Sequence, residues 1–360
     1  MSQSKHLLVG SAETYSGKSA AILGVGLQLI QQGLTIAYGK PLEGSESELD
    51  QQTDDDVQFI TKTLHLADNQ VRPTVLTLDA STIQQYMAGQ LQADYGGQLS
   101  HYLDLTDSDL VLLEGPDTLS AGQLFGLSLP QIAQSLDAHT LLVARYHSAL
   151  VVDSILDAKQ KLGDRLLGVL INDIPDEDWE QVNTAVQPFL EQLQIPVLGL
   201  LPRNDILRSV SVGELVRQLD ADVICCPDRM ELMVESLKIG AMNVNSALKY
   251  FRKAHNMAVV TGGDRTDLQL AALETSTHCL ILTGQLPPMD TVRHRAEDLE
   301  IPVLSVDLDT LTTVEVIDQA FGQVRFREAI KVQCVQELMT QHFDLQRLME
   351  MLDLKPAVAV

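Results

Sequence analysis

Gly17, Lys18 and Ser19 stand together near the start of the chain, in an order that suits phosphate binding. A glycine lets the backbone approach phosphate oxygens closely, a lysine can reach the outer phosphates, and a serine hydroxyl can ligate Mg²⁺. The strict G-x-x-x-x-G-K-[ST] pattern is broken, because Ala12 stands where the first glycine is expected and Gly10 comes too early. The alternative interpretation is an ordinary turn between a strand and a helix.

The segments that flank these residues favour phosphate binding. His6–Gly10 is a short apolar run typical of a buried strand, and Ala20–Ile30 is an apolar stretch of helical length. A helix that begins directly after a tight turn offers unpaired backbone N–H groups to an anion. We therefore expect a nucleoside triphosphate and Mg²⁺ at this loop, with Lys18 in a catalytic role. The predicted cofactor contacts in the loop are Thr14, Gly17, Lys18, Ser19 and Ala20.

Carboxylates elsewhere in the sequence fit the same chemistry. A hydrophobic run that begins at Asp109 ends in Glu114, the usual place for an acid on the magnesium side. Asp54, Asp55 and Asp56 form an acidic cluster at a predicted helix start. Such a cluster can ligate a metal ion or can stabilise the positive end of the helix dipole, and both interpretations stay open.

The first two hundred residues alternate short apolar runs with amphipathic stretches of helical length. The runs are rich in Val, Leu and Ile and lack polar alternation, as expected for parallel strands buried on both faces. This pattern predicts a doubly wound α/β domain with a parallel sheet. The predicted strands are His6–Gly10, Thr35–Tyr38, Thr74–Leu78, Leu110–Glu114, Thr140–Ala144, Leu166–Ile171 and Val197–Leu200, and the helices include Ala149–Leu162 and Glu177–Leu193.

The pattern of predicted strands and helices changes after Pro202, where a second, smaller α/β domain is predicted. Its expected helices are Val212–Leu219, Arg229–Ile239, Val244–Phe251, Arg265–Glu274, one near Thr291–Leu299 and one from Thr313, and its expected strands are Met257–Val260, Cys279–Leu282 and Pro302–Val306. Apolar residues at helical spacing then predict one long helix over Arg327–Leu352, packed on its own body or on a second subunit. We expect a P-loop domain at residues 1–205, the smaller domain at 206–325 and a C-terminal helical segment at 326–360.

The second domain contains its own candidate ligand site. Gly262 and Gly263 follow a predicted strand and permit positive φ angles, while Asp264 or Thr266 can cap the following helix. Arg265 suits bidentate contact with an anion, and Thr283 follows the next strand. These residues predict a site for a small phosphorylated or nucleotide-like effector. The alternative is a purely structural turn in which the glycines form the bend, Asp264 caps the helix and Arg265 pairs with Asp267 or a neighbouring carboxylate.

Composition excludes several partners. The formal charge is −24, so the surface repels nucleic acid and anionic lipid. No apolar run approaches the roughly 20 residues that span a bilayer, and the N-terminus lacks a signal-peptide pattern, so we expect a cytoplasmic protein with no membrane partner. The four cysteines include no CxxC pair and are expected to be reduced structural thiols.

The motifs of the first domain resemble those of dethiobiotin synthetase and of the related cobyrinic acid a,c-diamide synthase group of P-loop proteins. The matching pieces, in the family's order, are the loop Ser11–Ser19, Tyr38-Gly-Lys40-Pro41, Val111-Leu-Leu-Glu114-Gly115, Gly168-Val-Leu-Ile-Asn172 and Val197-Leu-Gly-Leu-Leu-Pro202. The second domain resembles a DRTGG domain through the stretch from Val259 to Asp267. The pairing of the two is similar to the N-terminal region of long bacterial phosphotransacetylases, without the acetyltransferase catalytic domain, so acetyl transfer is not expected.

The resemblance implies a role for individual residues. It implies ATP as the nucleotide, with Lys18 and Ser19 as triphosphate and Mg²⁺ contacts. It implies metal ligation by Ser19, Glu114 and an acid of the 54–56 run, for which we choose Asp56. Asn172 matches an asparagine that reads the adenine base, and Lys40 matches a catalytic lysine that faces substrate and phosphate.

The departures from the synthetase pattern lie on the substrate side. The family's Gly-rich turn after the strand acid is replaced here by Gly115-Pro116-Asp117-Thr118, and a family serine four residues past the lysine is replaced by Gly44. Proline removes a backbone donor and aspartate adds a negative charge. We therefore expect an ATP-binding regulatory or sensor protein, with or without slow ATP hydrolysis, that forms a homo-oligomer and acts on a protein partner. The alternative function is an ATP-dependent ligase or carboxylase of the dethiobiotin synthetase type.

Overall fold

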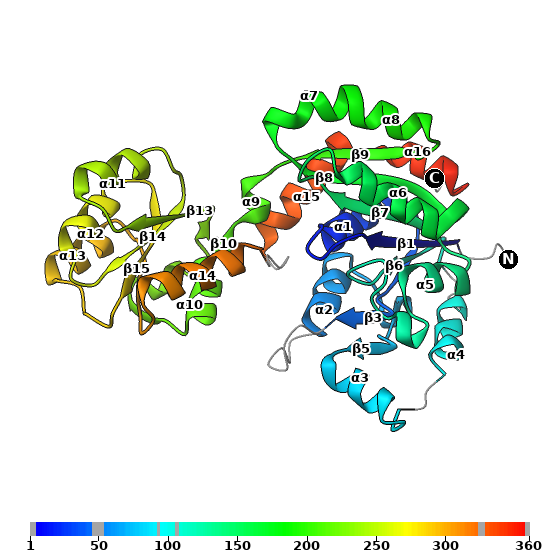
Figure 1. Ribbon diagram of the computed structural model, residues 1–360, viewed down its shortest axis with the longest axis horizontal. Helices are drawn as coiled ribbons and strands as arrows, with labels where there is room; N and C mark the ends of the chain where they lie inside the picture. The colour runs from blue at the N-terminus through cyan, green and yellow to red at the C-terminus, as the bar shows by residue number, and fades with distance from the viewer. Residues whose placement is uncertain (1–4, 45–53, 92–93, 105–107, 323–327, 357–360) are drawn as a thin grey trace. The chain divides into compact units, whose positions relative to one another are not determined.

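The computed structural model describes residues 5–44, 54–91, 94–104, 108–322 and 328–356 (Figure 1). The chain forms two compact units. The first unit combines Met1–Arg203 with Phe326–Val360, and the second consists of Asn204–Arg325. The C-terminal segment is therefore part of the first unit, and the second unit is an insertion within it.

A parallel sheet forms the centre of the first unit. Within the described residues it has seven strands in the order β4-β2-β6-β1-β7-β8-β9. The strands are β1 (Lys5–Ser11), β2 (Ile36–Gly39), β4 (Val71–Arg72), β6 (Leu110–Glu114), β7 (His139–Arg145), β8 (Leu166–Ile174) and β9 (Val197–Pro202). Every pairing between neighbours is parallel. The predicted α/β class with a parallel P-loop sheet is confirmed.

Both faces of this sheet are buried. Leu8 and Leu142 belong to one apolar cluster together with Ile132 of α5 and Ile155 of α6. Leu7, which precedes Leu8 and points to the opposite face, is also fully buried. Helix α1 packs against β1, β2 and β6, and helix α15 packs against α1 and β9. The apolar runs of the sequence lack alternation because helices cover the sheet on both sides.

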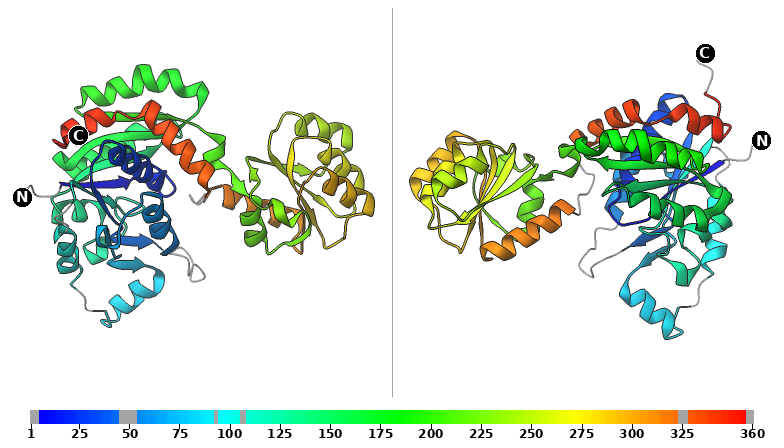
Figure 2. Two further views of the ribbon diagram at one scale, coloured as in Figure 1. Left: turned by 180° about the vertical axis from the view of Figure 1, so that it is seen from behind. Right: turned by 45° about the horizontal axis from the view of Figure 1, so that its top comes forward.

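The helices of the first unit follow most of the predicted amphipathic stretches (Figure 2). They are α1 (Lys18–Gln31), α2 (Asp54–Thr63), α3 (Ala80–Met87), α4 (Tyr95–Ser100), α5 (Leu129–Ser135), α6 (Val151–Leu162), α7 (Trp179–Gln181), α8 (Gln187–Gln192), α15 (Ala329–His342) and α16 (Leu345–Met351). A π-helical turn at Val182–Val186 joins α7 to α8.

The strand predicted at Thr74–Leu78 does not belong to the main sheet. Its residues Leu76–Leu78 form β5, which pairs with β3 (Leu42–Gly44) in a separate two-stranded sheet. The edge of the main sheet is instead the short strand β4, which pairs with Tyr38 and Gly39 of β2. The β-branched and apolar composition of the run was correctly interpreted as a strand, but composition does not specify its partner.

The single long helix predicted over Arg327–Leu352 is wrong. The structure has two helices, α15 and α16, separated at Phe343 and Asp344. Phe343 forms a β-bridge with Gly199, and the backbone N–H of Asp344 donates to the carbonyl of Leu198 at 2.7 Å. The Asp344 side chain then accepts from the Arg347 N–H and caps α16. Pairing with the edge strand β9 thus interrupts the helix.

Helix α15 directs its apolar side toward the first unit's own core. A Cβ on Gly24 of α1 would lie 2.4 Å from Cγ of Met339, so the two helices meet closely at this glycine. Val335 and Met339 are almost fully buried. The helix therefore packs on its own unit, and it offers no support for a second subunit; the oligomeric state stays a prediction.

The second unit contains a five-stranded sheet in the order β11-β16-β15-β14-β13. Its strands are β11 (Asp222–Cys225), β13 (Ser236–Gly240), β14 (Met257–Gly262), β15 (Thr277–Thr283) and β16 (Val303–Val306), and a small antiparallel pair joins β10 (Val210–Ser211) to β12 (Met233–Val234). Its helices are α9 (Asp205–Arg208), α10 (Val212–Leu219), α11 (Val244–Phe251), α12 (Thr266–Leu273), α13 (Asp290–Asp298) and α14 (Thr310–Gly322). Strand β11 is antiparallel to β16, and the other neighbours are parallel.

The helix predicted over Arg229–Ile239 is also wrong. This stretch contributes β12 and then enters β13, which pairs in parallel register with β14 from Ser236 opposite Met257 to Gly240 opposite Thr261. The backbone N–H of Glu235 donates to the carbonyl of Asn256 at 2.8 Å, which continues the extended conformation. Pairing with β14 therefore overrides a composition of Met, Leu and Glu that favours a helix in isolation.

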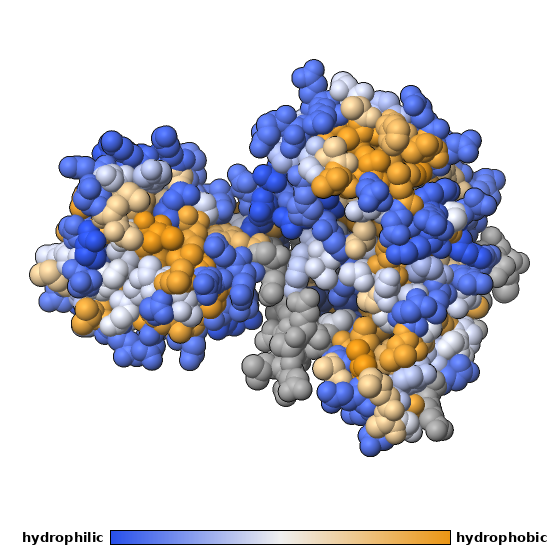
Figure 3. All heavy atoms as spheres, viewed as in Figure 1, coloured by the Kyte–Doolittle hydropathy of each residue, from blue (hydrophilic) through white to orange (hydrophobic). Residues whose placement is uncertain are grey.

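The remaining surface properties agree with the composition. Hydrophilic residues cover much of the face drawn in Figure 3, and hydrophobic residues gather there in separate patches on each unit. Among the described residues, no helix combines the length and apolar character required to cross a bilayer. All four cysteines are free, and Cys225, Cys279 and Cys334 are buried. Burial raises the pKa of the Cys225 thiol to about 12, which keeps it protonated.

Candidate functional site

The loop between β1 and α1 carries the predicted phosphate-binding residues. Gly17 is the residue that precedes α1 and has a left-handed backbone with φ of 98°. A Cβ at this position would lie 2.3 Å from Nδ2 of Asn172, so a larger residue would be both strained and crowded. Glycine therefore allows the chain to turn sharply into the helix, where the first N–H groups lack intrahelical partners.

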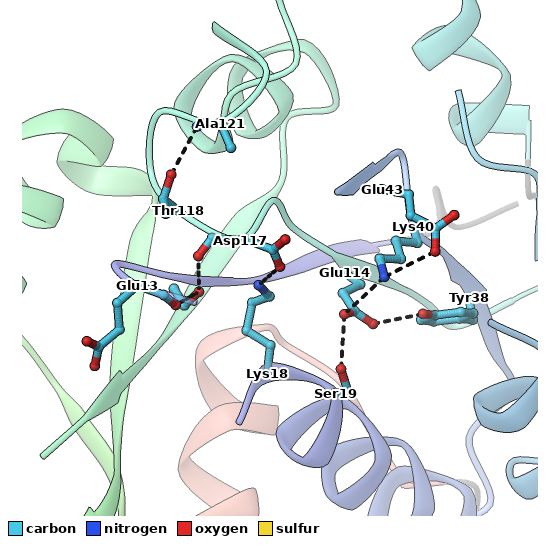
Figure 4. A network of polar contacts seen from close by, with 11 residues as sticks. Glu13, Lys18, Ser19, Tyr38, Lys40, Glu43, Glu114, Asp117, Thr118 and Ala121 are labelled. Carbon is cyan, nitrogen blue, oxygen red and sulfur yellow. Dashed lines mark hydrogen bonds and ion pairs between the residues drawn. The ribbon is translucent and has the colours of Figure 1, made fainter. Parts of the chain in front are cut away.

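Lys18 begins α1 and is almost completely buried, with a side-chain exposure of 6%. Its ammonium nitrogen lies 2.8 Å from Oδ1 of Asp117, in the segment that follows β6 (Figure 4). Burial by itself raises the pKa of Asp117, but the charge and hydrogen bond of Lys18, together with the charge of Lys40, hold that pKa below its ordinary value. Lys18 and Asp117 therefore form an ion pair at the place where the sequence predicts a phosphate.

Ser19 and Glu114, both predicted to be magnesium ligands, lie within hydrogen-bond distance of each other. The Ser19 hydroxyl donates to Oε1 of Glu114 at 3.1 Å, and the Tyr38 hydroxyl donates to Oε2 at 2.9 Å (Figure 4). Burial raises the pKa of Tyr38 well above its ordinary value, and the Glu114 carboxylate raises it further. The phenol therefore remains protonated and fixes the orientation of Glu114. Tyr38 was part of the quoted motif, but its role was not predicted.

Lys40 lies among carboxylates. Its ammonium is 3.7 Å from Oε1 of Glu43 and 3.9 Å from Oε1 of Glu114. Burial by itself lowers the pKa of Lys40, but Glu114, Glu43, Asp56 and Asp117 together raise it above the ordinary lysine value. The side chain is thus a buried, permanently charged ammonium that faces the same carboxylate as Ser19.

The other predicted loop and metal residues are placed as follows. Asn172 lies near the end of β8, and its amide nitrogen donates to the carbonyl of Ser16 at 2.9 Å. Thr14 is exposed and Ala20 is buried in the first turn of α1. Asp56 is half-buried in the first turn of α2 and raises the pKa of both Tyr38 and Lys40, so its charge acts on the site. The side chains of Asp54 and Asp55 lie outside the described residues.

The side chains around the loop determine whether a metal ion could be held there. Within the part of the chain that the structure describes, no three His, Cys, Asp or Glu side chains form a cluster that could hold a metal by themselves. The Ser19 hydroxyl and the Glu114 carboxylate nevertheless supply two converging oxygen atoms. Mg²⁺ in nucleotide sites is held by one or two such oxygen ligands together with phosphate oxygens and water. The Ser16 hydroxyl is buried without a hydrogen-bond partner in the same loop.

The turn after β14 differs from its prediction in two ways. Gly262 and Gly263 do not have positive φ, and a Cβ on Gly263 would lie 2.6 Å from the carbonyl oxygen of Leu286. Gly263 therefore serves close packing against the Leu286 backbone. The residue that precedes α12 is Arg265, without a side-chain cap, so the predicted cap by Asp264 or Thr266 is wrong. Gln269, which the sequence did not single out, instead donates its amide to the carbonyls of Gly262 and Gly263 at 2.9 and 3.0 Å.

Arg265 and Thr283 both have partners within the second unit. The Arg265 guanidinium contacts Asp267 with Nε and Nη2, each at 3.1 Å, and Nη2 also donates to the carbonyl of Met242. The Thr283 hydroxyl lies 2.9 Å from that of Thr310. The structural alternative for Arg265, pairing with Asp267, is thus realised here, and ligand binding at this turn stays a prediction.

A parallel sheet, a glycine turn and a buried lysine that begins the following helix define the first unit as a P-loop nucleotide-binding domain. The chain belongs to the AAA domain family (AAA_26), whose model matches residues 5–211. The DRTGG domain model matches residues 214–320. The predicted combination of a P-loop domain and a DRTGG domain is confirmed.

Several of the relatives are phosphate acetyltransferases. The enzyme of Nitratidesulfovibrio vulgaris is 24% identical over an alignment of 365 positions, which covers 96% of this chain and 51% of the enzyme. The enzyme of Synechocystis sp. is 24% identical over 311 residues, which cover 81% of this chain and 44% of the enzyme. The chain thus spans about half the length of these curated relatives and matches their N-terminal part.

Among solved structures, one similar chain comprises the CBS and DRTGG domains of the regulatory region of Clostridium perfringens pyrophosphatase, complexed with the activator diadenosine tetraphosphate. It is 20% identical, with a TM-score of 0.30, and the match covers 47% of this chain and 85% of that chain.

Proposed function

We propose that this chain is a cytoplasmic regulatory protein that binds MgATP at the P-loop. The observation that carries the proposal is the convergence of Lys18, Ser19 and Glu114 at the carboxyl edge of β1 and β6. Ligands of parallel α/β sheets bind outside the carboxyl ends of the strands, which is where these side chains meet.

In this proposal each residue has a separate task. Lys18 holds the outer phosphates, and the first N–H groups of α1 contact phosphate oxygens. Ser19 and Glu114 offer oxygen ligands to Mg²⁺, with Asp56 on the same side, and Asn172 contacts the base. Bound Mg²⁺ neutralises phosphate charge and polarises the phosphoryl group. Lys40 supplies a second positive charge beside Glu114.

A regulatory function is favoured over ligation by the residues after β6. Pro116 has no N–H to offer a substrate carboxylate, and the Asp117 carboxylate points at Lys18. A carboxylic acid substrate would meet this negative charge at the place where a synthetase binds its acid. We propose that the DRTGG unit takes a small phosphorylated or nucleotide effector at Gly262, Gly263, Asp264, Arg265 and Thr283, and that nucleotide and effector together control a protein partner.

The test is isothermal titration calorimetry of the full chain with MgATP. We expect saturable binding that Lys18→Ala weakens at least tenfold, because charge-assisted contacts to phosphate contribute about 1.5–3 kcal/mol each. Lys161→Ala is the matched control, since Lys161 is exposed on α6 and pairs with Asp157 at 2.8 Å. Circular dichroism establishes that both variants are folded.

Two results would contradict the proposal. Equal affinity of Lys18→Ala and the parent chain for MgATP would show that the loop does not bind the nucleotide. Phosphate release that rises tenfold or more on addition of one carboxylic acid would identify a ligase or carboxylase instead.

A further inference from the structure

The ion pair between Lys18 and Asp117 places a carboxylate where an anionic ligand must bind. The two charged groups are 2.8 Å apart, and Lys18 is buried. The backbone of Asp117 has a contact of its own, because its carbonyl lies 3.0 Å from the Ser11 hydroxyl, whose single hydrogen it shares with the carbonyl of Glu13 at 2.9 Å. A change of the Asp117 side chain leaves this backbone contact in place.

Gly44 makes room for this carboxylate. A Cβ at position 44 would lie 2.6 Å from Oδ2 of Asp117, which is too close for two unbonded atoms. Gly44 has an ordinary backbone conformation outside the positive-φ region, so the backbone itself does not require glycine there. The two departures from the synthetase pattern, Asp117 and Gly44, are thus in contact with each other across the site.

The Lys18 ammonium has three N–H donors, so an anion that binds it either displaces the Asp117 carboxylate or binds beside it. In both cases the carboxylate lies next to a phosphate group, and two negative charges at such a distance repel each other, although the Asp117 side chain is 46% exposed. A divalent cation removes this penalty, because Mg²⁺ accepts carboxylate and phosphate oxygens as ligands at the same time. A free phosphate or a metal-free polyphosphate has no such compensation.

We propose that Asp117 is a specificity-determining residue that makes anion binding at Lys18 conditional on a divalent cation. It admits a magnesium complex of a polyphosphate and excludes the metal-free polyphosphate and inorganic phosphate. The inference rests on the proposed function at the P-loop and adds the form of the ligand that the site selects.

The experiment measures the dissociation constants of ATP and of inorganic tripolyphosphate, each in Mg²⁺ and in EDTA, at fixed ionic strength. For the parent chain we expect binding in Mg²⁺ and at least tenfold weaker binding in EDTA. Asp117→Asn should tighten binding in EDTA at least tenfold and reduce the ratio between the two conditions. Gly44→Ala should act in the same direction without any change of charge, because its methyl group displaces the Asp117 carboxylate from Lys18.

The matched control is Asp157→Asn, which removes the same charge from an exposed position on α6, where Asp157 pairs with Lys161. It should leave all four dissociation constants unchanged. If Asp117→Asn and Asp157→Asn bind both ligands in EDTA as weakly as the parent chain, the inference is wrong. Failure of the proposed function has a different signature, since Lys18→Ala would then bind MgATP as well as the parent chain does.

Discussion

Four carboxylates and two ammonium groups act on one another around the P-loop. The pKa of Lys40 is raised by four carboxylates, those of Glu114, Glu43, Asp56 and Asp117. Their charges therefore all lie close enough to interact with the Lys40 ammonium. With Lys18 as the second cation, the group carries more negative than positive charge before any ligand binds. A polyphosphate would add further negative charge, so the proposed nucleotide would bind this group more favourably together with a divalent cation.

The hydrogen bond from Tyr38 to Glu114 orients one carboxylate of this cluster, and its contribution to stability can be measured. Both side chains are buried, and the hydroxyl of Tyr38 lies 2.9 Å from Oε2 of Glu114. Tyr38→Phe should lower the free energy of unfolding by about 1–3 kcal/mol, because it removes a donor from a buried carboxylate. Urea unfolding at pH 7 measures this value. Tyr250→Phe, at a tyrosine that is 58% exposed, is the control and should have almost no effect. Equal stability of the two variants would contradict the prediction.

At the residue scale, the sequence predicted the types of side chain in the site but not their pairing. Lys18, Ser19 and Glu114 follow a strand–turn–helix pattern and a strand end, so local spacing was sufficient to select them. Asp117 was recognised only as an added negative charge. Its partner Lys18 is 99 residues away in the chain, and the contact depends on the parallel neighbours β1 and β6. Such a contact arises from tertiary structure and has no local signal.

At the scale of elements, strand pairing decided where the predictions failed. Six of the seven described strands of the main sheet were predicted, because burial on both faces produces apolar runs, and the short edge strand β4 was missed. The Arg229–Ile239 stretch and the C-terminal helix were predicted from composition and helical spacing alone. Both are interrupted where their backbone pairs with a neighbour, β14 in the first case and Gly199 of β9 in the second. A propensity is a weak preference that a hydrogen-bonded partner overrides.

An ion pair joins α16 to the end of α8. The Arg347 guanidinium contacts both carboxylate oxygens of Glu191 at 2.7 and 2.9 Å, and Oε1 also accepts from the N–H of Val197. The hydrogen bond from Arg347 lowers the pKa of Glu191 below its ordinary value. A lowered folded-state pKa stabilises the protein above the unfolded value of about 4.3, and this stabilisation is lost as the pH falls through the folded value.

Glu191→Gln should therefore be less stable than the parent chain by about 1 kcal/mol at pH 7, a modest value because the pair is partly exposed to solvent. The difference should shrink as the pH falls below about 4.3. Urea unfolding over a pH series measures it, with the exposed Glu180→Gln as control. A constant difference at all pH values would contradict the assignment of the effect to this ion pair.

At the scale of the molecule, the first unit is built from two separate stretches of chain. Residues 1–203 contribute the sheet, and the segment after residue 325 returns to the same unit as α15 and α16. The second unit lies between them in the sequence and has its own sheet and buried clusters. Both ends of the second unit are therefore covalently joined to the unit that carries the P-loop.

Removal of the returning segment should destabilise the P-loop unit even though the segment contains no site residue. A chain that ends at Arg325 lacks α15, whose side chains Val335 and Met339 are buried against the unit. Each such side chain contributes about 1.5–3 kcal/mol when fully buried, so the loss should lower the melting temperature of the first unit by several degrees or more. Differential scanning calorimetry with and without MgATP identifies that unit's transition, because a ligand raises the stability of the unit that binds it. A chain that ends after Leu354 is the control and should melt like the parent chain. If the shorter chain retains the parent's ligand-sensitive transition unchanged, then α15 is not part of the cooperative core around the P-loop.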